Sequence, residues 1–373
     1  MTKALLRTKL CDLFDIEYPI ILAGMGDVIR DYTVSTGKLC AAVSNAGGLG
    51  TIGGGTMSAA QLRHEIRDAK SLTKKPFGVD LIFPAGPAID GTVSEIQAKL
   101  PADLTGFIDG WYEQYKVPHE KGPEVKIFDE GLAMQQWKIV VDEGIKIIAL
   151  GLGTPDWIIP EAHAKEMKVM CLVGNVRQAA RLAGMGADLI IAQGHEAGGH
   201  TGRIGLMSLL PAIVAAVSPV PVVAAGGIVI GSQLAAALAM GAVGVWIGTA
   251  FEATFESPIT ELGKQKLVEA DEESARISKI YTGKTARTLR NPFTESWEKA
   301  GLRTLPMPYQ NYLVRDFFYS LERNKPELIF VGSGQGVGLI KKIRSAKEVV
   351  DDFVQGTVEV LKKRLQDEVT IKN

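Results

Sequence analysis

Short apolar runs alternate along the chain with longer segments whose apolar residues recur at helical spacing. Such runs are typical of parallel strands buried on both faces, and the longer pattern is typical of amphipathic helices that cover them. The pattern predicts eight strands, at 19–25, 48–53, 76–83, 145–151, 168–173, 187–193, 221–226 and 243–248. It predicts helices at 34–46, 58–71, 129–143, 156–165, 176–186, 205–217 and 231–241.

Eight strand–helix alternations favour an α/β fold in which the strands close into a parallel (β/α)8 TIM barrel. The alternative is an open, doubly wound sheet, which would need a G-x-G-x-x-G phosphate fingerprint after an early strand. The glycines of 24–26, 53–55 and 332–338 do not have that spacing, and the last segment lies near the end of the chain.

Two segments fall outside the alternation. Residues 84–128 are far longer than an ordinary βα loop and follow the third strand, so we expect this excursion on the active face. It would be a partial lid or a substrate-shaping element; a solvated decoration or an oligomer contact is the alternative. Residues 257–373 have a mostly helical pattern. The predicted domains are a barrel core over 1–256, and a 257–373 segment that begins with the last barrel helix and continues as a helical accessory lobe over the active face.

Composition narrows the class of protein. The chain has 373 residues, 46% of them hydrophobic, which is enough for a large globular core. Its net charge of -1 gives no basic excess for nucleic acid or membrane binding. Three cysteines without C-x-x-C spacing argue against a disulfide scaffold or zinc site, and predict buried thiols. Without a signal-peptide core or a long apolar span, the expected location is the cytoplasm.

The strongest chemical signal is the glycine-rich loop at 193–202, which follows the sixth strand and carries two histidines. Its glycines let the backbone approach a flat or phosphorylated ligand closely. His200 would project from this loop, where a group that titrates near neutral pH can act on the ligand. A tight turn with solvated histidines is the alternative, which a second glycine cluster downstream makes less favourable.

That second cluster lies in the loops after strands seven and eight, at 225–228 and 248–250. In a TIM barrel these loops commonly bind phosphate through unobstructed backbone N–H groups. Tight turns without a ligand are the alternative. One phosphate site beside a broad glycine-lined face predicts a mononucleotide such as FMN, with the loop 23–26 passing near its ring.

Asp80 lies at the end of the third predicted strand and Gln193 at the end of the sixth, so both are expected on the same face of the barrel. Asp80 could accept a hydrogen bond from a ring N–H or bind a ribityl hydroxyl, or it could instead be a cap or loop anchor. His195 and His200 are five residues apart and no H-E-x-x-H is present, so we predict no metal.

Taken together, these motifs resemble those of the nitronate monooxygenase family, formerly the 2-nitropropane dioxygenases, which are FMN-dependent barrels. The resemblance covers nearly the whole chain. Its main carriers are 18–25, 46–50, 76–79, 193–202, 225–228, 282–291 and 332–335.

The resemblance implies a role for each matching residue. His200 has the position of the active-site histidine. The residues implied to hold the FMN phosphate are Gly226, Gly227, Gly248 and Thr249, and those implied to line the flavin are Ala23, Gly24, Met25, Gln193, Gly199 and Gln335. Asp80 stands where the family usually has Asn, which would alter the redox tuning of the flavin.

The activity implied is oxidation of alkyl nitronates with O2 to a carbonyl compound and nitrite, with His200 binding the nitronate oxygen or removing an α-proton. Similar chains include enoyl-thioester reductases, acyl-CoA dehydrogenases and NAD(P)H:quinone reductases. In that alternative, Arg287, Arg290 and Arg303 would pair with coenzyme A phosphates, or they are ordinary surface arginines. A flavin-carrying scaffold without turnover is a third reading. The substrate is expected to be a small molecule, with O2 or NAD(P)H as redox partner; the oligomeric state, a homodimer included, stays open.

Overall fold

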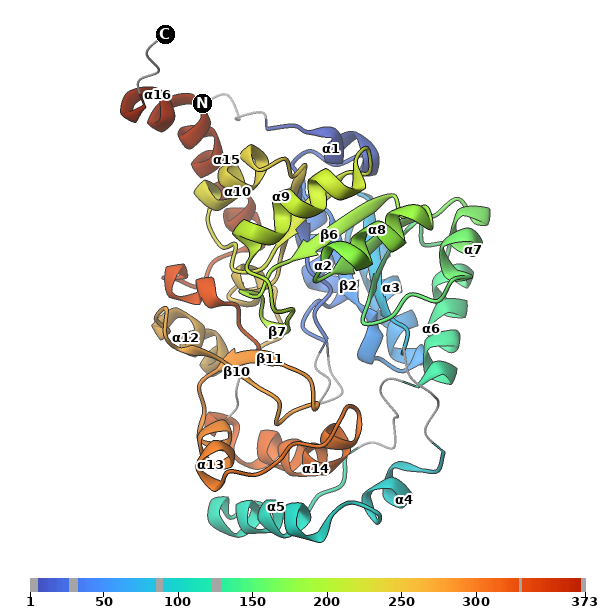
Figure 1. Cartoon of the computed structure of the whole chain (residues 1–373), viewed down its shortest axis with the longest axis vertical. Coiled ribbons are helices and arrows are strands. Elements are labelled where there is room, and N and C mark those ends of the chain that lie inside the picture. The colour runs from blue at the N-terminus through green and yellow to red at the C-terminus, as the bar shows by residue number, and fades with distance from the viewer. Residues whose placement is uncertain (1–5, 27–32, 85–89, 123–128, 329–330, 370–373) are drawn as a thin grey trace.

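The computed structural model describes residues 6–26, 33–84, 90–122, 129–328 and 331–369, and its centre is a barrel of parallel strands (Figure 1). The strands are hydrogen-bonded in the order β1-β9-β8-β6-β5-β4-β3-β2. Their bounds are Ile20–Leu22 (β1), Gly50–Gly53 (β2), Phe77–Ile82 (β3), Ile147–Gly151 (β4), Lys168–Val173 (β5), Leu189–Gln193 (β6), Val222–Ala225 (β8) and Gly244–Ile247 (β9).

The barrel closes between its first two strands. Leu49 N donates to Ile20 O and Leu22 N donates to Leu49 O, each at 2.9 Å, which joins β1 to the start of β2. All eight strands lie where the apolar runs predict them, so the predicted TIM-barrel fold is confirmed.

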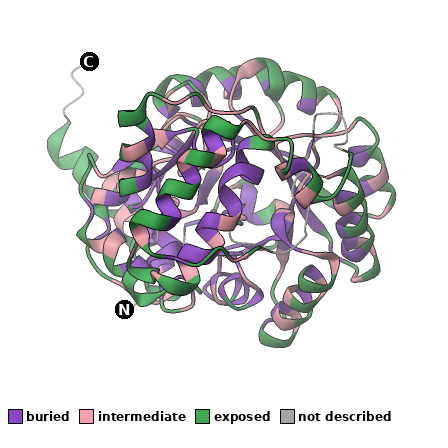
Figure 2. Ribbon diagram, turned by 90° about the horizontal axis from the view of Figure 1, so that it is seen from below, coloured by how far each residue is buried: buried purple, intermediate pink, exposed green. Residues whose placement is uncertain are grey.

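Helices surround the barrel with their buried faces turned inward (Figure 2), and the buried residues of these faces are mainly hydrophobic. Seven helices lie at the predicted segments, and only α3 extends past its segment, by one residue. The helices α2, α3, α6, α7, α8, α9 and α10 lie at Gly37–Asn45, Ala59–Leu72, Glu130–Asp142, Ile158–Ala164, Val176–Gly184, Leu206–Val217 and Gly231–Ala239. Inside the barrel, alternate strand residues form a separate core, with the short helix α1 (Lys9–Phe14) contributing Leu10, Cys11 and Phe14. All three cysteines are buried free thiols.

The helix that completes the ring is α15 (Ala346–Glu359), which packs against both α10 and α2. The sequence placed the last barrel helix at the start of 257–373, but α15 lies near the end of that segment. A helical pattern does not identify which of several helices fills the gap between two others; here α11 (Thr249–Glu252) and α12 (Glu261–Glu269) come first in sequence. The division into domains stays a prediction.

A second core forms beyond the barrel mouth, at the lower end of Figure 1. There α4 (Val93–Gln97) and α5 (Ala102–Tyr115), from the excursion, lie against α13 (Pro292–Ala300) and α14 (Tyr309–Asn324). Trp111 is only 1% exposed and lies amid the rings of α13 and α14. Helix α5 is therefore an integral part of the lobe and not a solvated decoration.

The lobe segment also contains strands that the sequence did not predict. β10 (Ala275–Ser278) pairs antiparallel with β11 (Ala286–Leu289), and β11 pairs with the two-residue strand β7 (Gly199–His200). Backbone hydrogen bonding thus joins the lobe directly to the histidine loop. Within the described ranges, no helix is both long and apolar enough to cross a membrane.

The packing of α15 can be tested at Gly231, the first residue of α10. A Cβ there would lie 2.5 Å from Phe353 O and 2.6 Å from Thr357 N of α15, so Gly231→Ala must push the two helices apart. We expect a loss of about 1–3 kcal/mol in the free energy of unfolding, measured by urea denaturation. Gly106→Ala, where a Cβ meets nothing within 4 Å, is the control and should be neutral or stabilising. Equal effects would contradict the contact.

Candidate active site

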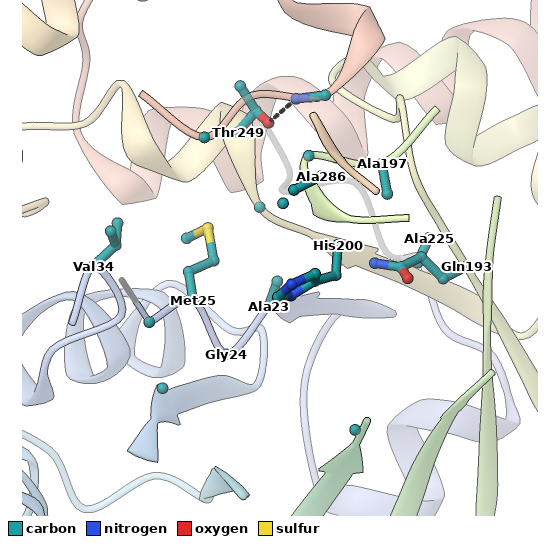
Figure 3. A pocket seen from close by; sticks show the side chains of 18 of the residues that line it. Ala23, Gly24, Met25, Val34, Gln193, Ala197, His200, Ala225, Thr249 and Ala286 are labelled. Carbon is teal, nitrogen blue, oxygen red and sulfur yellow. Dashed lines mark hydrogen bonds between the residues drawn. The ribbon is translucent and has the colours of Figure 1, made fainter. Parts of the chain in front are cut away.

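A cavity of about 290 Å³ lies at the carboxyl ends of the barrel strands (Figure 3). The structure brings together on its wall all but one of the predicted site residues: Ala23, Gly24, Met25, Asp80, Gln193, Gly199, His200, Gly226, Gly227, Gly248 and Thr249. These residues come from strand ends and loops far apart in sequence, and the closure of the barrel brings them together.

The exception is Gln335, which begins the 3-10 helix η3 (Gln335–Leu339). Its side chain is exposed and its backbone N donates to Glu196 O at 2.8 Å. The motif 332–335 instead reaches the cavity through Gly332 and Gly334.

His200 is held from both its backbone and its ring. Its backbone pairs with Ala286 in β11, and its Nε2 lies 2.8 Å from Thr282 Oγ1. Burial, reinforced by the positive charge of Lys284, lowers the pKa of His200 from 6.5 to about 4. The imidazole is therefore neutral at pH 7, so it can hydrogen-bond a ligand but cannot form an ion pair with one.

Thr282 is a site residue that the sequence analysis did not assign, although it begins one of the segments that carry the family resemblance. It is 1% exposed and lines the cavity. Only the folding of β10 and β11 against the histidine loop reveals its role, because it lies 82 residues from its partner.

Asp80 lies in β3 beside Gly53 and Ala149. Burial raises the pKa of its carboxyl group from 3.8 to about 7, so near neutral pH it can donate or accept a hydrogen bond. A Cβ on Gly24 would lie 2.2 Å from Asp80 Cβ, which means that only glycine lets the first loop pass over this side chain.

The opposite end of the cavity is formed by the two loops predicted to hold phosphate. Gly226 and Gly227 have φ values of +103° and +71°, which side-chain-bearing residues rarely adopt. Thr249 Oγ1 accepts a hydrogen bond from Gly334 N at 2.9 Å (Figure 3). Backbone groups therefore dominate this end, as a phosphate site requires.

Thr56 tests whether the cavity suits a polar ligand. Thr56 lines the cavity and is 2% exposed, and its buried hydroxyl has no hydrogen-bond partner among the described residues. Buried hydroxyl groups are normally paired, so this one fits a ligand with polar groups along its length.

The three arginines considered for coenzyme A phosphates lie elsewhere. Arg287 is buried and donates to Ala275 O at 3.2 Å and His195 O at 3.0 Å. Arg290 pairs with Glu295, and Arg303 with Asp103 at 2.6 Å. None of the three lines the cavity. Among the described residues, no group of three or more His, Cys, Asp or Glu could hold a metal.

Sequence comparison decides the family. The profile described as nitronate monooxygenase matches residues 7–356. The chain belongs to the nitronate monooxygenase family. A probable nitronate monooxygenase of Staphylococcus aureus is 35% identical over 88% of this chain and 91% of its own.

Two solved structures are similar to this chain over nearly its whole length. Nitroalkane oxidase from Streptomyces ansochromogenes superposes with a TM-score of 0.78 at 29% identity, covering 94% of this chain and 98% of its own. FabK from Thermotoga maritima gives a TM-score of 0.76 at 29% identity, covering 98% and 100%. Like the family it belongs to, this nitronate monooxygenase homologue is a flavin-dependent oxidoreductase that acts on small molecules.

The protonation state of His200 can be measured directly. In a 13C-histidine-labelled sample, with His200→Asn for assignment, the ring should titrate well below 6.5, towards about 4. Because the folded state keeps His200 neutral, its unfolded form takes up a proton first, and stability should fall as the pH drops from about 6.5 towards 4.

The same measurement separates the two causes of the shift. Lys284→Gln should raise the pKa of His200 but leave it below 6.5, because burial is the larger cause. Lys279→Gln, an exposed lysine on the same segment, is the control. A wild-type ring that titrates near 6.5 would contradict its burial.

Proposed function

We propose that the protein is an FMN-dependent nitronate monooxygenase, which oxidises alkyl nitronates with O2 to a carbonyl compound and nitrite. The observation that carries the proposal is the neutral imidazole of His200 at a glycine-lined cavity on the barrel mouth. Family membership supports the reaction type.

The cavity residues suit FMN in two parts. Gly226, Gly227, Gly248 and Thr249 would hold the phosphate, and the loop 23–25 with Gln193 and Gly199 would flank the ring system. When bound, the flavin would accept electrons from the substrate and pass them to O2. Gln335, which the resemblance also implied, would need to move to take part.

His200 would bind the nitronate by donating a hydrogen bond to a nitro oxygen, in a cavity where burial strengthens such bonds. The Thr282 hydroxyl orients the imidazole ring through its hydrogen bond with Nε2 of His200. A base with a pKa near 4 is poorly matched to proton removal at neutral pH. The preformed nitronate is therefore the better substrate, and the neutral nitroalkane the poorer one.

Hydride transfer to or from an acyl thioester is the second candidate. The likeness to FabK favours it, and a neutral His200 could equally hydrogen-bond a thioester carbonyl. This candidate needs NAD(P)H or an acyl thioester as redox partner, and the arginines assigned to it by sequence do not line the cavity.

One comparison discriminates between the two candidates. Purified yellow protein is mixed under air with ethyl nitronate, and in parallel under nitrogen with NADH followed by an enoyl-CoA. Oxygen uptake with nitrite release supports the proposed function. Flavin bleaching that the enoyl-CoA reverses, without nitrite release in the first arm, would replace it.

The role of His200 predicts similar losses for both substrates. His200→Asn should reduce turnover of the preformed nitronate about tenfold or less, because one hydrogen bond is lost. Turnover of a neutral nitroalkane should fall by a similar factor, because a base with a pKa near 4 contributes little to proton removal at neutral pH. Initial rates of nitrite release measure both, and a loss of about 10²-fold or more on the nitroalkane alone would show that His200 acts as a base.

Titration of Asp80 predicts that the midpoint potential of the bound flavin depends on pH. Above pH 7 the Asp80 carboxylate is charged and disfavours an electron-rich ring, whereas below pH 7 it is neutral. Asp80→Asn should therefore raise the two-electron midpoint potential by roughly 30–60 mV at alkaline pH and change it little at acid pH. Asp109→Asn on the exposed face of α5 is the control. A pH-independent difference would contradict titration of Asp80.

A further inference from the structure

A second cavity, of about 1100 Å³, lies over the carboxyl ends of β3 to β6. It shares four lining residues with the first cavity: Leu152, Leu172, Gln193 and His200. His200 therefore stands where the two spaces meet. The second space alone would hold a drug-sized molecule, which is far more than a short alkyl nitronate fills.

One end of this cavity carries two positively charged side chains, whose backbone segments are hydrogen-bonded to each other. Arg203 and Lys284 line it, and neither has an ion-pair partner among the described residues. Their two segments are tied together, because Thr201 N donates to Thr285 O at 3.1 Å and Thr285 Oγ1 donates to Thr201 O at 3.2 Å.

The remaining charges on the wall do not cancel this excess. Arg181 also lines the cavity but pairs with Asp156 at 2.6 Å. Glu130 is the only acidic residue among the described lining residues. Arg203 and Lys284 are thus the cations available to an anionic ligand.

The other end of the cavity is apolar. Phe83 and Trp157 meet edge to face with ring centroids 5.6 Å apart, and Leu152 continues this wall. Trp157 is 36% exposed although it also packs on Trp137, at 6.2 Å between centroids. An apolar chain that binds along this wall would shield the exposed part of Trp157 from water.

We propose that the second cavity binds the body of an elongated amphiphilic substrate, with an anionic group at Arg203 and Lys284 and an apolar chain along Phe83 and Trp157. The inference rests on the proposed function only in placing the reacting carbon at His200. Both ends are needed, because the charges select an anion and the aromatic wall selects chain length.

The experiment measures binding rather than turnover. Calorimetric titration of the purified holoprotein uses octanoate, octan-1-ol as its uncharged match, and butanoate as its short match. Octanoate should bind about tenfold more tightly than octan-1-ol, and each methylene beyond butanoate should add up to about fourfold. Octyl phosphate distinguishes the source of the charge: tighter binding than octanoate points to a phosphorylated carrier, equal binding to a simple carboxylate.

The variant Arg203→Gln/Lys284→Gln should lower octanoate affinity about tenfold, to that of octan-1-ol. Arg177→Gln, an exposed arginine of α8 that does not line the cavity, should change nothing. If the double variant fails to fold, the wild type still gives the test, because high salt should weaken octanoate binding and leave octan-1-ol unaffected.

Equal binding of octanoate and octan-1-ol, or retention of octanoate affinity in the folded double variant, overturns the inference. Its failure is separable from failure of the proposed function. Nitrite release from ethyl nitronate without charge-selective octanoate binding rejects only the inference about the ligand of the second cavity. Charge-selective binding without nitrite release rejects nitronate oxidation and leaves the ligand class standing.

Discussion

The pairing of β7 with β11 is the interaction on which the site depends. Two residues of the loop after β6, Gly199 and His200, form antiparallel backbone bonds with Ala286 and Arg287 of the lobe. Arg287 adds a hydrogen bond to His195 O at 3.0 Å. A glycine-rich loop has little conformational preference of its own, so these bonds fix where the imidazole points.

The lobe and the barrel therefore both determine the position of the His200 side chain. Thr282, which holds Nε2, and Lys284, which acts on its charge, both lie in the turn between β10 and β11. The lobe core in turn requires α5 from the excursion. Segments distant in sequence therefore converge on one ring through short strands and a shared aromatic core.

The barrel could be predicted from sequence because its strands are buried on both faces and so are almost wholly apolar, as in 187–193. Its glycine-rich loops could also be predicted, since the positive φ values at positions 226 and 227 favour glycine there. The strands β7, β10 and β11 could not be predicted, because they lack the apolar runs of the barrel strands and their pairing is set by tertiary contacts. The role of Thr282 depends on the same tertiary contacts, and a helical pattern cannot show that α15, rather than an earlier helix of 257–373, completes the ring.

The electrostatics of the site follow from burial. Desolvation is the leading cause of the shifts at both His200 and Asp80, and it moves each group towards its neutral form. His200 is thus neutral and Asp80 titrates near neutral pH, while Arg203 and Lys284, which have no ion-pair partner among the described residues, line the second cavity. In the proposed arrangement, charge recognition and redox chemistry would be separated in space, with His200 lining both cavities. A barrel built like this could change its substrate by altering the loops around the second cavity without disturbing the groups proposed to hold the flavin.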